Sequence, residues 1–313
     1  MTGKLRAAGA LAGRAGALAG ICMAAACTSP STTASAVSGK STHAPAASPG
    51  RTAPAATATI SAAATPAPIP PHVTVSRMRT ADGSLVTVAT FRGPVRYVLH
   101  NGSQDPGPAA SGLVKAGPAV TGAERRRLLA VFNGGFKLNT GVGGYVQEGH
   151  VISSLRNGLA SLVIDRSGRA RIGIWGDHLP EPGEAVYSVR QNLQPLVRNR
   201  QPTPAAADWT LWGATLGGGE YVARSAVGEN TAGDLIYAAS MSTAPADLAY
   251  ALARSGARTA MELDINPEWV QLDTAHSPGG HLTASVPGQY RPSSQYLVGW
   301  TRDFITVLAA ATG

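Results

Sequence analysis

Two acidic residues near the end of one predicted strand are the strongest candidates for chemistry in this sequence. Residues 259–265 are mostly apolar and predict a β-strand in which Glu262 and Asp264 share one face, with Leu263 opposite in the core. Two carboxylates at that spacing suit acid and base catalysis, because their repulsion raises one pKa. They would also suit a hard cation such as calcium. An alternative stays open, in which Asp264 forms an Asx-type turn into Asn266.

A second candidate is the run of an asparagine and two glycines that follows the apolar residues 128–132. Glycines at a strand end let backbone N–H groups approach a ligand closely. Gly134 and Gly135 could therefore bind substrate through their amides, while Asn133 holds a hydroxyl or an amide. A plain turn between Phe132 and Phe136 fits the same residues.

A third candidate is Arg224, in the predicted strand 221–227. Its planar guanidinium could bind a phosphate or carboxylate with two parallel hydrogen bonds. A surface arginine on an edge strand is the alternative. The seven histidines are scattered, and the only two cysteines, Cys22 and Cys27, lie near the N-terminus. We therefore expect no zinc site, no cysteine nucleophile and no resident cofactor, although calcium is left open.

The elements that must position these residues are mostly strands. Alternating or apolar runs predict strands at residues 72–79, 84–91, 94–99, 128–132, 159–165, 169–175, 209–216, 221–227, 234–240 and 259–265. Asp82-Gly83 and residues 166–168 predict hairpin turns. One helix should begin near Pro245, capped by Ser242 or Thr243, and end at Gly256. The pattern predicts an α+β fold of mixed, mostly antiparallel sheets with few helices and one strand–helix–strand unit at 234–264.

The N-terminus indicates export. Residues 1–27 combine basic residues, a short apolar stretch and an Ala-Ala-Ala-Cys sequence typical of a signal peptide with a lipobox, so Cys27 is the expected lipidation site. An ordinary signal cleaved after Ala36 is the alternative. From Thr28 to Pro70, 35 of 43 residues are Ala, Pro, Ser or Thr, which predicts a disordered tether over 28–71. We expect residues 72–313 to form one domain on the outer face of a bacterial cell membrane, with secretion as the second choice.

The net charge of +8 is partly explained by export. Lys4, Arg6 and Arg14 belong to the predicted signal, and without them 23 basic residues face 18 acidic ones. The dense basic run, residues 125–127, has no interleaved aromatic residues. We therefore expect no nucleic-acid partner, and no protein partner is evident.

Taken in chain order, six motifs between residues 128 and 269 resemble those of the phosphodiester glycosidase family. They are Asn133-Gly134-Gly135-Phe136, the glycine-rich segment 144–149 with its Glu148-Gly149 turn, the apolar strand 159–165, Gln194-Pro195-Leu196-Val197, the Arg-Ser-x-x-Gly strand 224–228, and Leu263-Asp264 after a helix.

The resemblance implies a hydrolase that cleaves a sugar–phosphate diester or a related glycan bond in the cell envelope. Arg224 would hold the diester anion, while Asp264 with Glu262 would act at the anomeric carbon. The substrate-binding residues would be Asn133, Gly134, Gly135, Glu148 and Arg156.

One departure from the family pattern follows Leu263-Asp264. The family has a Gly-Gly-Gly-Ser-Ser run there, whereas this chain has Ile-Asn-Pro-Glu-Trp. Trp269 could offer a stacking face for a sugar, or it could be a core residue. The loss of the glycine run favours an alternative function, a non-catalytic glycan-binding lipoprotein of the envelope.

Overall fold

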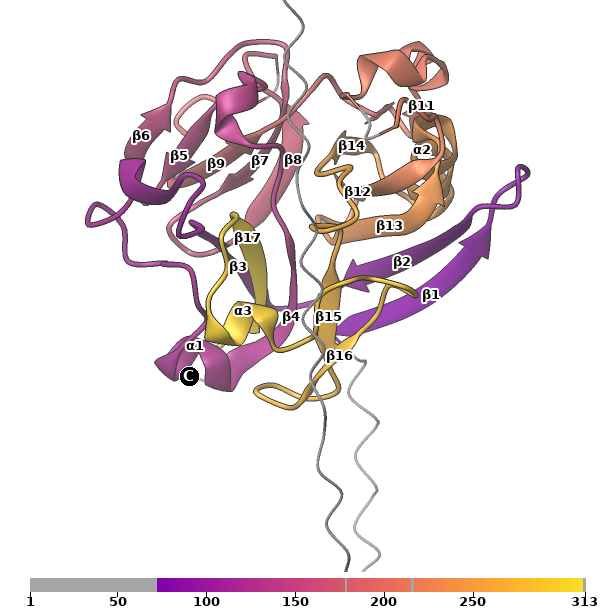
Figure 1. Ribbon diagram of the computed structural model, residues 1–313. Coiled ribbons are helices and arrows are strands. Elements are labelled where there is room, and N and C mark those ends of the chain that lie inside the picture. Colours follow the sequence, from indigo (N-terminus) through magenta and orange to yellow (C-terminus); the bar gives the residue numbers. More distant parts are fainter. Residues whose placement is uncertain (1–71, 178, 215–216, 312–313) are drawn as a thin grey trace, which may run out of the picture. The chain divides into compact units, whose positions relative to one another are not determined.

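The computed structural model describes residues 72–177, 179–214 and 217–311 (Figure 1). They belong to one compact unit that spans residues 66–313. The predicted signal peptide, Cys27 and the tether lie outside the described residues. Among the helices that the structure describes, none is both long and apolar enough to cross a membrane.

The largest sheet has seven strands in the order β1-β2-β13-β12-β14-β10-β11. Every neighbouring pair in it is antiparallel. Its strands are β1 (Val73–Arg79), β2 (Leu85–Phe91), β10 (Val197–Arg198), β11 (Gln201–Pro202), β12 (Val222–Glu229), β13 (Leu235–Thr243) and β14 (Thr259–Glu262).

Two five-stranded antiparallel sheets complete the described fold. The second sheet has the order β16-β15-β4-β17-β3, and the third has the order β6-β5-β9-β7-β8. The second contains β3 (Val95–His100), β4 (Leu128–Asn133), β15 (Leu272–Ala275), β16 (Leu282–Ala284) and β17 (Phe304–Ala309). The third contains β5 (Tyr145–Gln147), β6 (His150–Ser153), β7 (Ala160–Ile164), β8 (Ala170–Ile174) and β9 (Ser188–Gln191).

Helices are few and short among the described residues. The α-helices are α1 (Gly122–Arg127), α2 (Pro245–Arg254) and α3 (Gln295–Val298), and the 3₁₀ helices are η1 (Gly107–Ala109), η2 (Leu138–Thr140), η3 (Pro204–Ala207) and η4 (Trp209–Leu211). Helix α2 connects β13 to β14, with β12 between them in the sheet. The predicted α+β class and the strand–helix–strand unit are therefore confirmed.

The seven-stranded sheet buries both of its faces, and residue parity separates them. Tyr237 of β13 and Met261 of β14 join the central core shared with the other two sheets. Ile236 and Ala260 point to the opposite face, where they pack with Leu248 of α2. This period of two explains why the central strands carry almost continuous apolar runs.

Two local predictions are wrong. Residues 209–211 form the 3₁₀ helix η4 instead of a strand, because the Asp208 side chain accepts a hydrogen bond from the Thr210 amide. Helix α2 begins after Ala244, and no side chain caps it. The hydroxyl of Thr243 donates to the carbonyl of Ala244 instead of accepting from the helix.

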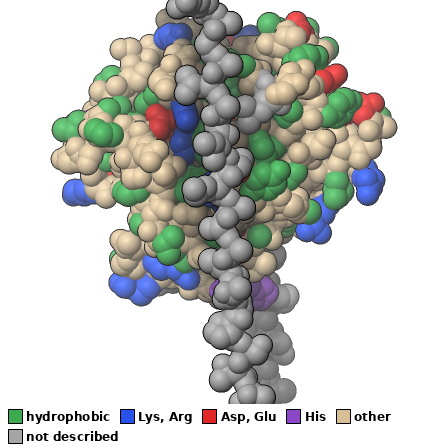
Figure 2. Space-filling view, in the orientation of Figure 1, with side chains coloured by type: hydrophobic (Ala, Val, Ile, Leu, Met, Phe, Trp, Pro, Cys, Tyr) green, Lys and Arg blue, Asp and Glu red, His purple; other side chains and the backbone are tan. Residues whose placement is uncertain are grey.

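Figure 2 shows how the surface residues are distributed on one face of the molecule. Hydrophobic side chains gather over the region of β12 and β13, whereas Lys and Arg side chains lie in small separate groups. The basic residues 125–127 end α1, where Arg125 donates to two carbonyls of the loop at Gly279 and Gly280. This arginine therefore fixes a loop of its own chain.

Candidate functional site

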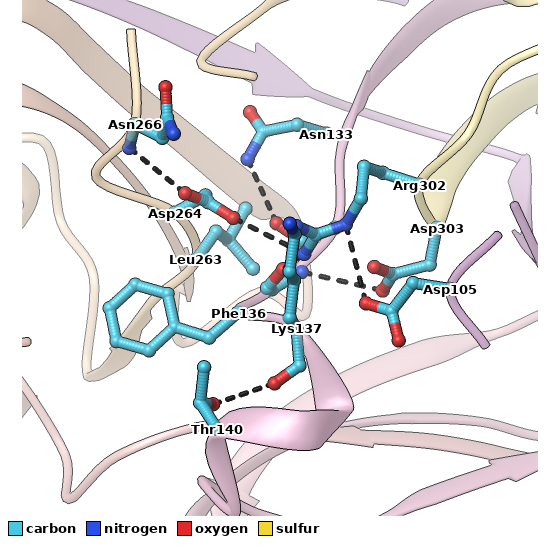
Figure 3. Close-up of polar contacts among 12 residues, drawn as sticks. Asp105, Asn133, Phe136, Lys137, Thr140, Leu263, Asp264, Asn266, Arg302 and Asp303 are labelled. Carbon is cyan, nitrogen blue, oxygen red and sulfur yellow. Dashed lines mark hydrogen bonds and ion pairs between the residues drawn. The ribbon is translucent and has the colours of Figure 1, made fainter. Parts of the chain in front are cut away.

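The candidate site lies where strand β4 ends and β17 begins. The two strands are antiparallel neighbours, with Asn133 paired to Phe304, so the residues after β4 face those before β17. Arg302 and Asp303 precede β17 and lie against Gly134 and Gly135. Figure 3 shows Asp264, from the seven-stranded sheet, reaching the same place.

Strand β14 ends at Glu262, so it is shorter than the predicted strand 259–265, and Asp264 lies two residues beyond it at 3% exposure. Its Oδ1 accepts hydrogen bonds from the amides of Ile265 and Asn266 at 2.8 and 2.9 Å, which is the Asx-type turn considered as the alternative. Its Oδ2 lies 3.5 Å from Nη2 of Arg302. Burial raises the pKa of Asp264 to about 7, although Arg302 and the two amides oppose the rise. The carboxyl therefore changes protonation near neutral pH.

Arg302 is the centre of the cluster and is 4% exposed. Its Nε lies 3.3 Å from Oδ2 of Asp105, and its Nη2 donates to the carbonyl of Gly135 at 2.8 Å. Its Nη1 is buried and has no hydrogen-bond partner among the described residues. Because buried N–H groups are normally paired, this nitrogen has unused hydrogen-bonding capacity.

Two cations lie against one tryptophan beside this cluster. The guanidinium carbon of Arg302 is 4.2 Å from the ring centroid of Trp269, and Nζ of Lys137 is 4.8 Å from the same centroid. Such contacts stabilise cations on an aromatic surface. Lys137 is exposed and Trp269 is half-buried, so they form the solvent side of the site. Stacking of a sugar on Trp269 stays a prediction.

The two glycines make room for a second buried ion pair. Oδ2 of Asp303 accepts from Nε of Arg190 at 2.7 Å, and both side chains are buried. A side chain on Gly134 would collide with Asp303, and a Cβ on Gly135 would lie 2.9 Å from the guanidinium carbon of Arg190. The Gly134 amide donates to the Asp303 carbonyl, and the Gly135 amide points to its carboxylate at 3.4 Å. Both amides thus have protein partners, and substrate binding by them stays a prediction.

Asn133 has all of its hydrogen-bonding capacity occupied. Its Nδ2 donates to the carbonyl of Gly134 and to Oγ of Ser225, and its Oδ1 accepts from the hydroxyl of Tyr237 and the amide of Gln271. At 2% exposure it connects two sheets inside the protein. Its predicted contact with substrate would require at least one of these bonds to break.

Arg224 and Glu262 form a buried ion pair away from solvent. Nη1 of Arg224 donates to Oε1 of Glu262 at 2.8 Å, and both side chains are 0% exposed. The remaining guanidinium N–H groups point at the carbonyls of Trp212, Glu220 and Thr243. Burial raises the pKa of Glu262, and Arg224 opposes that rise. Four of the five N–H groups of Arg224 thus have protein partners, and its predicted binding of a diester anion stays a prediction.

The structure does not bring Glu148 and Arg156 into the cluster. The carboxylate of Glu148 accepts from the amides of Lys115 and Ala116. Arg156 is exposed and donates to the carbonyl of Gly141. Their predicted roles in substrate binding stay untested.

Sequence reasoning missed Arg302, Asp303, Arg190, Asp105 and Lys137. Two of these carried a local signal: Arg302-Asp303 is a charged pair directly before an apolar strand, and Lys137 directly follows the Asn-Gly-Gly-Phe run. Arg190 and Asp105 had none, since each reaches the site from a different loop or sheet.

The arrangement combines a titratable carboxyl with cations that suit an anion. Asp264 can take up or release a proton near pH 7, while Arg302 and Lys137 supply positive charge beside it. Among the described residues, no group of three His, Cys, Asp or Glu side chains is placed to hold a metal ion.

The buried Arg224–Glu262 pair predicts a large loss of stability when one partner is removed. Arg224→Ala leaves the Glu262 carboxyl uncompensated and should lower the unfolding free energy by about 3–5 kcal/mol in urea titrations. Arg198→Ala is the control, because it breaks the exposed pair with Asp177 and should change the unfolding free energy by less than about 1 kcal/mol. Equal effects of the two variants would contradict this reading.

The raised pKa of Asp264 predicts a pH-dependent stability. Between about pH 4 and pH 7 the folded protein keeps a proton on Asp264 that the unfolded chain has lost, so this group lowers stability as pH rises. The unfolding free energy of Asp264→Asn minus that of the wild type should therefore increase across this range, by at most about 1.4 kcal/mol per pH unit. Urea unfolding from pH 4 to 8 measures the difference, and a flat line would refute the assignment.

The comparisons with known proteins show similarity at the level of fold. No model of a known protein family matches the sequence, and no curated protein sequence matches it. Three of the solved structures with a similar fold are the catalytic domain of zebrafish N-acetylglucosamine-1-phosphodiester alpha-N-acetylglucosaminidase, a hypothetical protein from Synechocystis, and a Burkholderia pseudomallei protein that is described as exported. They share 16%, 14% and 13% identity with this chain, with TM-scores of 0.47, 0.45 and 0.38. The matches cover 76%, 76% and 72% of this chain and 82%, 62% and 74% of the other.

Proposed function

We propose that this protein is a hydrolase that cleaves a sugar–phosphate diester, with Asp264 and Arg302 at its reaction centre. The observation that carries the proposal is the pairing of a buried carboxyl, whose pKa is raised to about 7, with a guanidinium whose Nη1 has no hydrogen-bond partner among the described residues. The anion of a phosphate diester can bind the guanidinium of Arg302. The carboxylate of Asp264 can then act in the reaction at the anomeric carbon of the sugar. The order of sequence motifs favours the same chemistry.

The proposed step is attack by water on the anomeric carbon of the sugar. Ionised Asp264 accepts a proton from the water molecule while the water oxygen bonds to that carbon. The bond between the carbon and the phosphate oxygen breaks, and its electron pair leaves with the phosphate monoester. Arg302 and Lys137 stabilise the leaving group, whose existing negative charge reduces the need for an acid. Because Asp264 must be ionised, the rate should rise with pH through about 7.

Access to the centre depends on its solvent side. Asp264 and Arg302 are nearly buried, whereas Lys137 is exposed. A substrate therefore meets Lys137 first, and the diester anion replaces part of its contact with Trp269.

Hydrolysis of sugar-1-phosphate methyl diesters in ¹⁸O-labelled water tests the proposal directly. Attack at the sugar carbon puts the label in the released sugar, whereas attack at phosphorus puts it in the phosphate, which mass spectrometry distinguishes. Asp264→Asn and Arg302→Gln should each lower the rate at least about 100-fold.

Asp208→Asn is a suitable control, because Asp208 is exposed and caps η4, a role that asparagine can also fill. It should keep full activity. Label in the phosphate, or full activity in folded Asp264→Asn, would sink the assignment.

The second candidate function is glycan binding without catalysis on the same fold. It is favoured by the residues that follow Asp264. The phosphodiester glycosidase family, which this sequence resembles, has a glycine-rich run there, whereas this chain has Ile265-Asn266-Pro267-Glu268-Trp269. It predicts retention of the wild type and of Asp264→Asn on purified cell wall, with no sugar released by either.

We further propose that the protein is exported and anchored by a lipid on Cys27. The support is the basic start, the short apolar stretch and the small residues before this cysteine. In a bacterial host, Cys27→Ala should move the protein from the membrane fraction to the medium or the soluble envelope fraction. Membrane retention of Cys27→Ala would contradict lipid anchoring.

A further inference from the structure

We propose that a second site, the arginine pocket, binds the phosphate ester of a saccharide or polyol. The pocket is a hollow of about 400 Å³ beside the edge strand β3 and the turn between β7 and β8. Its charged and aromatic lining includes Arg96, Arg127, Arg166, Asp165, Glu148 and Tyr187.

Each of the three arginines is held in place by a contact of its own. The stem of Arg96 lies across the turn at Gly168, where a Cβ would be 3.0 Å from it. Arg127 donates from Nε and Nη2 to the carbonyl of Ala309. The guanidinium of Arg166 lies 4.8 Å from the ring centroid of Tyr187. Positioned side chains lose less entropy on binding than free surface arginines, so the arrangement is preorganised for a ligand.

These contacts leave several N–H groups for a ligand. Within the described part of the chain, Arg96 donates only from Nη1, to the carbonyl of Val95, and Nη1 of Arg127 has no hydrogen bond. Among the described residues, Arg166 has the ring contact with Tyr187 and no hydrogen bond. Three guanidinium groups around one hollow match the oxygens of a phosphate.

The two carboxylates that line the pocket are already occupied by backbone amides. Both oxygens of Glu148 accept from the amides of Lys115 and Ala116. Oδ1 of Asp165 accepts from the amides of Ser167 and Arg169 and from the Ser167 hydroxyl. Neither forms an ion pair with an arginine of the pocket, and the three arginines outnumber the two carboxylates, so the pocket keeps a net positive charge.

A larger hollow nearby shows the opposite arrangement. It measures about 500 Å³, and its lining includes Arg171, Arg198 and Arg258. Arg171 pairs with Glu181 and Glu184, and Arg198 pairs with Asp177. Because carboxylates pair with two of its three arginines, this hollow has less positive charge available for an anion.

The arginine pocket is separate from the reaction centre. Strand β17 runs from Phe304, next to Arg302, to Ala309, whose carbonyl binds Arg127. The five steps from Phe304 to Ala309, at roughly 3.3 Å each, put about 16 Å between the two ends. The pocket therefore binds a ligand without contact to Asp264.

The size of the pocket favours an ester over free phosphate. Volumes of 300–1,000 Å³ are typical of small-molecule sites, so about 400 Å³ has room for a phosphate and one sugar or polyol unit. A hollow, unlike a flat basic surface, favours a soluble phosphate ester over a lipid headgroup.

Isothermal titration calorimetry with glucose 1-phosphate, inorganic phosphate and glucose tests the site. Wild type should bind glucose 1-phosphate more tightly than phosphate, and glucose should not bind. The double variant Arg96→Gln/Arg166→Gln should weaken binding at least about 10-fold, whereas Arg77→Gln, at an exposed position on β1, should leave it unchanged. Asp264→Asn should also leave it unchanged, which separates this site from the proposed reaction.

Hydrogen exchange on the wild type gives a measurement that does not depend on the variants. Glucose 1-phosphate should slow exchange at residues 95–98 and 165–169, and not at 264–269. The proposal is overturned if the double variant binds normally, or if protection appears only around Asp264. It is also overturned if phosphatidylglycerol vesicles bind through Arg96 and Arg166 while glucose 1-phosphate does not bind.

Discussion

The close approach of two glycines to a buried ion pair is the constraint on which the candidate site depends. Asp303 and Arg190 occupy the space that side chains on Gly134 and Gly135 would need. Their contact joins the strand end of β4 to the third sheet. Arg302, next to Asp303 in the chain, is thereby fixed where it faces Asp264 from the seven-stranded sheet (Figure 3).

The degree of pairing separates structural arginines from those suited to a ligand. Arg224 has a carboxylate at 2.8 Å and backbone carbonyls around the rest of its guanidinium, so it stabilises the fold. Arg302 has its carboxylates at 3.3 and 3.5 Å and one nitrogen with no partner among the described residues. Because its ion contacts are longer and Nη1 has no partner, Arg302 can form additional hydrogen bonds with an incoming anion.

The two proposed sites lie at opposite ends of strand β17 and suit different functions. At the start of β17, positive charge lies beside a carboxyl that titrates near pH 7, which suits a reaction. At its end, positioned arginines surround a hollow whose carboxylates are already occupied, which suits binding alone. A separation of about 16 Å along β17 means that one small ligand cannot fill both sites.

Local sequence patterns predicted strands β1–β4, β7, β8 and β12–β14, two hairpins and helix α2, because alternation, turn residues and helix periodicity act over a few neighbouring residues. They missed other strands, among them β9 and β17, which carry or flank the candidate site. They also marked Asp264 and its Asx-type turn. The sequence around Asp208 is compatible with the hydrogen bond that caps η4. It does not show that residues 209–211 are more stable in this 3₁₀ helix than in a strand. Only the tertiary structure decided that Arg224 pairs with Glu262 inside the protein and that Arg302 contacts Asp264, Asp105 and the ring of Trp269. These contacts join residues far apart in the chain, and no pattern along the sequence records which strand ends meet.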